Sequence, residues 1–295
     1  MLIEARKITK NFGSVQALRD VSFGIEKGST VGLLGPNGSG KTTTMRLVTG
    51  MIAPDAGVLD VEGKDPQKDG EAVRARCGVL TEQAAMYEEL TGEENLMFFA
   101  ALYGLNHADA VRRVHELAQL LNMKSYLANK AAGYSTGMKK RLCVARALIN
   151  RPDILILDEP TSGLDPESAQ SILRLIGELN SQEVTILLCT HNLAEAQKVC
   201  TDYIFLSHGN VIEQGGLDYL KKKYNHQEML NVTVSGAVPE KYAAENGVLR
   251  IPIHSREDIP GILRELCACA DVFDAHVEDY DLSDIYFKIR GEERA

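Results

Sequence analysis

The sequence predicts an α/β fold, and three observations lead to this prediction. A continuous apolar run at residues 31–34, typical of a buried parallel strand, is followed at once by a helical pattern. Alternating apolar and polar residues over 2–28 indicate antiparallel strands. Apolar residues recur at three- and four-residue spacing from Glu93 to Leu121, which indicates a helical insertion. We therefore expect an α/β core with an antiparallel β subdomain, a helical subdomain at about residues 90–150, and a small α+β C-terminal domain at residues 221–295.

Composition limits the class of protein and its surroundings. The 295 residues, 44% hydrophobic and 25% charged, suit one large globular domain and a smaller one. The formal net charge of −9 argues against nucleic acid as the main partner, which usually selects a basic face. The six cysteines form no C-x-x-C pair, so free thiols in a reducing compartment are expected. No apolar run reaches the ~20 residues that span a bilayer, and no signal peptide is apparent, so we expect a cytoplasmic protein.

A glycine-rich segment follows the first apolar run and opens a helix. It has the G-x-x-x-x-G-K-[ST] spacing of a phosphate-binding loop and consists of Gly35, Pro36, Asn37, Gly38, Ser39, Gly40, Lys41 and Thr42. Glycine lets the backbone turn successive N–H groups inward, and the helix N-terminus adds free donors. Lys41 is expected to reach the β- and γ-phosphates, and the Thr42 hydroxyl to ligate Mg²⁺. The spacing and context favour a nucleotide site over a simple glycine-rich turn.

Two adjacent carboxylates end the continuous apolar strand at residues 154–157. Asp158 and Glu159 therefore lie at a strand carboxyl end, where α/β sheets bind their ligands. Successive strand residues point to opposite sides, so we expect different roles: Asp158 holds hydrated Mg²⁺ and Glu159 polarises the attacking water. Such a pair can also be a helix cap, but the upstream phosphate loop favours the catalytic interpretation.

Three further positions have a functional and a simpler interpretation. Phe12 lies at a turn ahead of the loop, where it could stack on adenine or merely cover the core. Ser135 and Gly137 precede a helix, as a second anion site or an ordinary cap. His191 ends the strand 185–190 and would lie at the same sheet edge as the acid pair, within reach of a γ-phosphate, although such a histidine is usually a surface or core residue.

In their order along residues 2–217, these motifs resemble the nucleotide-binding subunit of an ABC transporter. The resemblance implies a P-loop NTPase core at residues 1–220, with ATP and Mg²⁺ as its ligands. It assigns the phosphate loop up to Thr43, the signature turn to Ser135–Met138 and the switch histidine to His191, with Lys41, Glu159 and His191 as catalytic residues. It further implies that the signature turn closes over the nucleotide of a second copy, so that two ATP sites are shared.

Two departures from the family pattern matter. The signature reads Tyr-Ser-Thr-Gly-Met where the family usually has Leu-Ser-Gly-Gly-Gln, which keeps Ser135 and Gly137. The family's glutamine-loop position, counted back from residues 90–91, falls on Glu82, with Gln83 as the alternative register. Glu82 is therefore a third candidate metal ligand.

Two segments resemble the exporter branch whose ATPase and membrane subunits are separate chains. They are residues 88–96 and 134–141, and residues 281–288 resemble the ending common in that branch. The resemblance implies ATP hydrolysis that powers export through a separate integral membrane permease, with this chain on the inner face of the cell membrane. The substrate cannot be read from the sequence, and residues 221–295 show no chemistry of their own.

Two alternative functions are weighed against transport. A soluble ABC ATPase acting on ribosomes or DNA would call for tandem nucleotide modules or a long coiled coil, and the chain shows one module without sustained heptads. A degenerate regulatory subunit would bind ATP without hydrolysing it. Glu159 and His191 are both present, which disfavours this second alternative.

Overall fold

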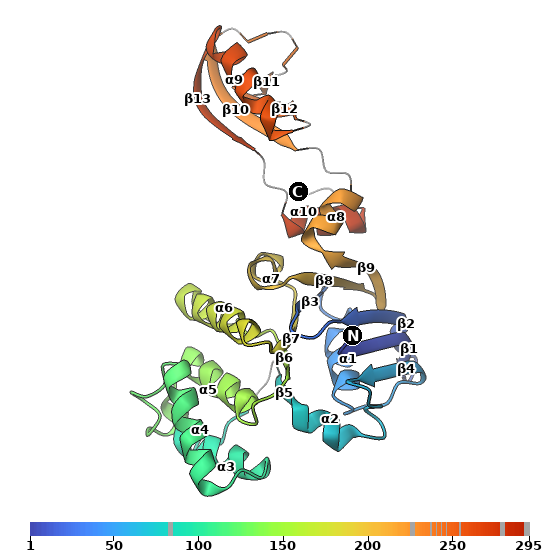
Figure 1. The fold of residues 1–295 in the computed structure, drawn as a ribbon, viewed down its shortest axis with the longest axis vertical. Helices are drawn as coiled ribbons and strands as arrows, with labels where there is room; N and C mark the ends of the chain where they lie inside the picture. Colours follow the sequence, from blue (N-terminus) through green and yellow to red (C-terminus); the bar gives the residue numbers. More distant parts are fainter. Residues whose placement is uncertain are drawn as a thin grey trace. The chain divides into compact units, whose positions relative to one another are not determined.

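The computed structural model describes residues 1–291 except 82–84, 225–227, 237, 240, 243, 246, 254 and 278–280. The chain divides into two compact units, Met1–Gly216 and Leu217–Ala295 (Figure 1).

A six-stranded sheet forms the centre of the first unit, in the order β5-β6-β7-β3-β8-β9. The strands are β3 (Thr30–Leu34), β5 (Cys77–Leu80), β6 (Ile154–Asp158), β7 (Thr185–Thr190), β8 (Asp202–Ser207) and β9 (Asn210–Gly216). All neighbouring pairs run parallel except β8 and β9. Every residue of β3, β6 and β7 is buried, as expected for strands covered on both faces. The parallel arrangement brings the carboxyl ends of β3, β6 and β7 to one edge, with Asp158 beside Cys189 and Leu34 beside Thr190.

The second sheet of this unit is antiparallel, in the order β2-β1-β4. It comprises β1 (Ile3–Phe12), β2 (Val15–Ile25) and β4 (Ala56–Val61). Helix α1 (Lys41–Val48) buries Met45, Leu47 and Val48 in a core that also contains side chains of both sheets. Helices α6 (Pro166–Ser181) and α7 (Leu193–Val199) lie on the opposite face of the six-stranded sheet (Figure 1). Helix α2 (Gly70–Arg76), which the sequence patterns do not predict, leads directly into β5.

Three helices form the helical subdomain: α3 (Gly92–Leu102), α4 (His107–Leu120) and α5 (Thr136–Leu148). The single helical stretch expected from Glu93 to Leu121 is in fact two helices. Gly104 adopts a φ of 78° between them, a left-handed conformation that ends a helix, and the Asn106 side chain caps α4 by accepting from the Asp109 N–H. The Thr91 side chain caps α3 through a capping box with Glu94.

The second unit is α+β. A four-stranded antiparallel sheet has the order β11-β12-β10-β13, built from β10 (Met229–Gly236), β11 (Ala244–Glu245), β12 (Val248–Pro252) and β13 (Ala270–Val277). Helix α9 (Ile259–Cys267) buries Leu266 among Leu230, Val232, Leu249 and Ile251 of the sheet. The unit also contains α8 (Leu217–Lys223) and α10 (Leu282–Arg290). The predicted fold class, an α/β core with antiparallel β and helical subdomains plus a small α+β unit, is confirmed.

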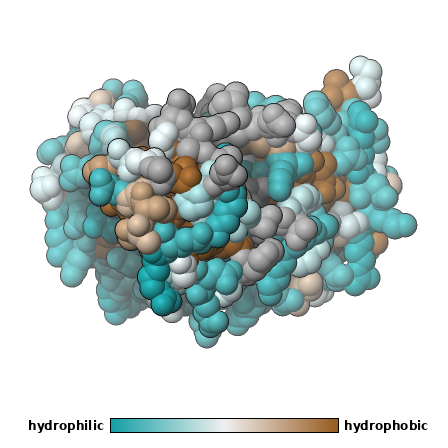
Figure 2. Space-filling view, turned by 90° about the horizontal axis from the view of Figure 1, so that it is seen from above, coloured by the Kyte–Doolittle hydropathy of each residue, from teal (hydrophilic) through white to brown (hydrophobic). Residues whose placement is uncertain are grey.

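In Figure 2 most surface residues are hydrophilic, and apolar ones occur in small groups. Over the described ranges, none of the helices has the length and apolar character needed to cross a membrane.

Candidate functional site

The phosphate loop connects β3 to α1 and packs tightly against its neighbours. A Cβ atom added at Gly35 would lie 2.2 Å from the Leu206 carbonyl oxygen, and one at Gly40, where φ is 113°, 2.6 Å from Leu18 Cδ2. Both positions therefore require glycine. Lys41 is only 7% exposed, and its side chain folds back across the loop, where Nζ donates to the Gly35 carbonyl at 2.7 Å. The loop thus holds an ammonium group inside its own curve.

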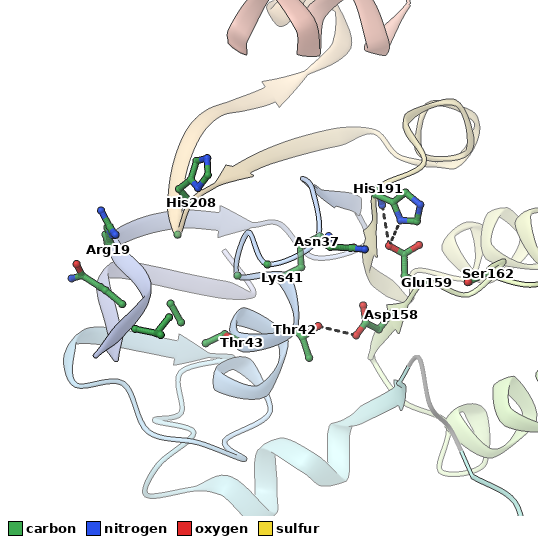
Figure 3. Close-up of a pocket in the computed structure, with 16 residues that line it drawn as sticks. Arg19, Asn37, Lys41, Thr42, Thr43, Asp158, Glu159, Ser162, His191 and His208 are labelled. Atoms are coloured by element: carbon green, nitrogen blue, oxygen red, sulfur yellow. Dashed lines mark hydrogen bonds and ion pairs between the residues drawn. The ribbon is translucent and has the colours of Figure 1, made fainter. Parts of the chain in front are cut away.

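A pocket of about 520 Å³ opens beside this loop (Figure 3). Its volume is within the ~300–1,000 Å³ usual for small-molecule sites. Most of the predicted site residues line it, namely Asn37, Gly38, Gly40, Lys41, Thr42, Thr43, Asp158, Glu159 and His191, together with Ser162 of the following loop. The structure therefore brings the phosphate loop, the acid pair and the histidine, which are far apart in sequence, to one cavity at the carboxyl ends of the parallel strands.

The residues predicted to hold Mg²⁺ are neighbours in this pocket. The Thr42 hydroxyl donates to Asp158 Oδ2 at 3.2 Å, and Asp158 is buried. A hydroxyl and a carboxylate are the hard oxygen donors that Mg²⁺ prefers, and Mg²⁺ commonly takes its other ligands from substrate phosphates and water. Thr42 and Asp158 fit such a partial set of ligands. In the described part of the chain, no group of three or more His, Cys, Asp or Glu side chains could hold a metal ion. Glu82 and Gln83 lie outside the described residues.

Glu159 is anchored at the end of β7. Its backbone has a φ of 46°, and its N–H donates to the Cys189 carbonyl at 2.9 Å. The carboxylate accepts from the Thr190 hydroxyl at 3.0 Å and from the His191 N–H at 3.0 Å, and it lies 2.7 Å from His191 Nδ1. The Glu159 side chain is 10% exposed and that of His191 60% (Figure 3). The arrangement provides a fixed proton acceptor with an accessible imidazole outside it.

Several predicted residues do not line the pocket. Phe12 ends β1 with 45% of its surface exposed, and Lys10 Nζ lies 5.5 Å from its ring centroid. Ser135 and Gly137 lie at the start of α5, where the Ser135 hydroxyl caps the helix by accepting from the Met138 N–H at 3.3 Å. Three loop residues also lie off the pocket surface, namely Gly35, Pro36 and Ser39.

Sequence reasoning missed a second wall of the pocket. It is formed by β2 and by the turn between β8 and β9, and comprises Val15, Gln16, Ala17, Arg19, His208 and Gly209. Two backbone bonds bring these segments to the phosphate loop: the Gly209 N–H donates to the Ser39 carbonyl at 3.0 Å and the Arg19 N–H to the Gly209 carbonyl at 2.7 Å. Residues 208–210 show only a turn signal in the sequence, which does not reveal what the turn contacts.

Known proteins that are similar to this chain indicate its family. The family described as ABC transporter matches residues 18–162. The ABC transporter ATP-binding protein NatA of Bacillus subtilis (strain 168) is 38% identical over 76% of this chain and 92% of its own length. The Nod factor export ATP-binding protein I of Cupriavidus pinatubonensis (strain JMP 134 / LMG 1197) is 32% identical over 99% of this chain and 91% of its own. A solved ATP-binding subunit of an ABC transporter is 32% identical with a TM-score of 0.70, covering 76% of this chain and 94% of the other.

A largely parallel sheet with a phosphate loop after β3 and an acid pair at the end of β6, with β7 between these two strands, defines a P-loop ATPase. More narrowly, the chain belongs to the family of ABC transporter ATP-binding proteins. The resemblance to exporter-type subunits is confirmed, and the relatives give no support to a ribosome- or DNA-linked role.

Proposed function

We propose that this ATPase uses Mg²⁺ and ATP to power export of a substrate through a separate integral membrane permease. The observation that carries the proposal is the buried Glu159 carboxylate, fixed in the same pocket as Lys41 and the pair formed by Thr42 and Asp158. The relatives support the direction of transport, since one of them is named for Nod factor export. The proposal places the chain at the inner face of the cell membrane.

The pocket residues divide the chemistry among them. Lys41 exchanges its carbonyl partners for the β- and γ-phosphate oxygens and balances their charge. Thr42 and Asp158 would hold Mg²⁺, which when bound neutralises charge on the phosphates. Glu159 orients the attacking water and accepts its proton, and the exposed side of His191 faces the γ-phosphate. Phe12, which pairs with the pocket residue Val15 across the β1–β2 hairpin, stacks on the adenine.

The signature turn points to a shared site. Ser135 is exposed at the N-terminus of α5 and does not line the pocket of its own chain. A helix N-terminus offers free N–H groups and a positive dipole end to an anion. We therefore assign Ser135 and Gly137 to the γ-phosphate bound by a second copy. ATP then joins two chains and favours the closed dimer by its differential affinity.

Glu159→Gln tests both parts of this proposal. The amide keeps the size of the side chain but accepts no proton, so nucleotide binding should remain while hydrolysis falls by roughly 100-fold or more, the usual range for a general base. The protein should then sediment as a dimer with ATP, in the presence of its permease if the isolated chain is too weakly associated. Near wild-type turnover in this variant would remove Glu159 from the catalytic role.

Ser135→Arg tests the shared site separately. It places a bulky cation where the second copy's phosphate must enter, so ATP binding to one chain should persist while dimerisation and turnover are lost. Ser181→Arg, at the exposed end of α6, is the matched control and should behave as wild type. Normal hydrolysis by Ser135→Arg within the permease complex would show that each chain works alone.

A further inference from the structure

We propose that Lys140 is a positioning residue for hydrolysis, which holds the main chain of Glu159 in its reactive place. Lys140 lies in the second turn of α5, and its Nζ donates to the Glu159 carbonyl oxygen at 2.9 Å. The inference rests on the proposed function, because it presupposes that Glu159 activates the attacking water. Lys140 touches neither the reacting water nor the phosphate in this role and acts only through Glu159.

The backbone conformation of Glu159 has to be stabilised by its surroundings. A φ of 46° lies in the left-handed region, which non-glycine residues adopt rarely and keep only when the surroundings fix them. The side chain and N–H of Glu159 are fixed by the end of β7, through Cys189, Thr190 and His191. These bonds restrain one side of the residue and leave its carbonyl to other partners.

The carbonyl side of Glu159 has two described donors. The Ser162 N–H approaches at 3.2 Å, from within the same loop, and Lys140 Nζ at 2.9 Å, from the helical subdomain. The Lys140 bond is the shorter of the two and carries a full charge, and charge-assisted bonds are about twice as strong as neutral ones. Because it comes from a helix and not from the loop itself, it fixes the loop against a rigid neighbouring element.

The adjacent lysine provides a natural control. Lys139 lies one position earlier on α5, and its Nζ pairs with Glu88 Oε1 at 2.8 Å on the surface. Removing the Lys139 ammonium changes the charge of α5 by the same amount as removing that of Lys140, but leaves the Glu159 carbonyl untouched. A difference between the two variants therefore reports the position of the charge and not its loss.

The test compares Lys140→Met, Lys140→Arg and Lys139→Met in the full chain, together with its permease. Methionine is an unbranched side chain one atom shorter than lysine and lacks the donor, whereas arginine restores a donor. For Lys140→Met we expect kcat to fall by about 10- to 100-fold, since a misplacement of about 1 Å can cost about 100-fold. ATP affinity and the thermal unfolding midpoint should stay at the wild-type values. Lys140→Arg should recover most of kcat, and Lys139→Met should lose none.

Two results would overturn the inference. The first is a wild-type kcat in Lys140→Met. The second is a loss of kcat that accompanies a drop in ATP affinity or thermal stability and is not recovered in Lys140→Arg. Glu159→Gln, measured in parallel, keeps this outcome separate from the proposed function. If Glu159→Gln hydrolyses ATP normally, the catalytic role that the proposed function gives to Glu159 fails, whatever Lys140→Met does. If it is inactive while Lys140→Met is normal, only the role of Lys140 fails.

Discussion

At the scale of single residues, Lys41 shows how the phosphate loop holds a charged side chain in place. Its ammonium is buried in the loop and satisfied by the Gly35 and Pro36 carbonyls at 2.7 and 3.2 Å. Phosphate oxygens carry a net negative charge, whereas these carbonyls carry only a dipole. Phosphate oxygens are therefore the stronger partners for the ammonium and can replace the carbonyls. The carbonyl bonds hold the ammonium within the curve of the loop, so contact with phosphate requires an exchange of its hydrogen-bond partners.

We predict that Lys41→Ala weakens ATP binding by about 10- to 100-fold, because a hydrogen bond to a charged group contributes about 1.5–3 kcal/mol. Titration with a fluorescent ATP analogue measures the change. Arg46→Ala is the matched control, since Arg46 is exposed in the last turn of the same helix. Equal affinity in Lys41→Ala and wild type would contradict the assignment of the loop.

The residues of this pocket were predictable from sequence to different degrees. Lys41, Asp158 and Glu159 could be placed together because their spacing after apolar strands fixes them at one sheet edge. The left-handed backbone of Glu159 and its bond to Lys140 could not be predicted. Neither residue type encodes a φ angle or a partner 19 positions away. The roles of all these residues remain predictions until the variants are measured.

At the scale of secondary structure, Asn95 shows how α3 is fixed to the loop before it. Its side chain is 0% exposed, although it is an amide within a helix. The Oδ1 atom accepts from the Tyr87 N–H at 3.0 Å, and Nδ2 donates to the carbonyls of Tyr87 and Thr91 at 3.0 and 2.9 Å. One side chain thus satisfies the backbone of a turn that follows the predicted glutamine-loop position.

Asn95→Ala should lower the free energy of unfolding by about 1–3 kcal/mol, since it removes three hydrogen bonds made by a fully buried side chain. Urea unfolding followed by circular dichroism measures the loss. Gln170→Ala, an exposed amide on α6, should change stability by less than about 0.5 kcal/mol. Equal stability of the two variants would show that water or another group replaces the Asn95 amide at no cost.

Sequence periodicity found most elements but not their boundaries. The stretch from Glu93 to Leu121 has one helical pattern because apolar residues keep their spacing on both sides of Gly104. The glycine and the Asn106 cap decide the break locally, and a periodicity argument does not weigh them. Helix α2 was missed for a related reason: it has seven residues, of which only Val73 is buried, and so short a segment gives almost no periodic signal.

At the scale of the whole chain, the cysteines divide between the two compact units. The four in the first unit, Cys77, Cys143, Cys189 and Cys200, are buried, and the two in the second, Cys267 and Cys269, are exposed. Burial raises the pKa of the Cys77 thiol to about 12 and also raises the pKa values of Cys143, Cys189 and Cys200. A thiol reacts as its thiolate. The four buried cysteines are therefore unreactive near neutral pH, both because reagents do not reach them and because their raised pKa values keep them protonated.

We therefore predict that a thiol reagent near neutral pH modifies only the second unit of the native chain. Peptide mapping by mass spectrometry should find the label at Cys267 and Cys269 within minutes, and at all six cysteines after unfolding in urea. Rapid labelling of Cys189 in the native chain would contradict its burial, and it would also question the packing behind the acid pair, because Cys189 pairs with Asp158 across the sheet.

The pocket takes its walls from segments far apart along the chain: β2, the loop before α1, the ends of β6 and β7, and the turn after β8. A molecule that contacts all of these segments links the two sheets of the first unit through its own contacts. By linkage, nucleotide at 100 times its dissociation constant should add about 2.7 kcal/mol to the stability of this unit. Hydrolysis and release would remove that link, so each turnover should leave the sheets less firmly joined than the ATP state did.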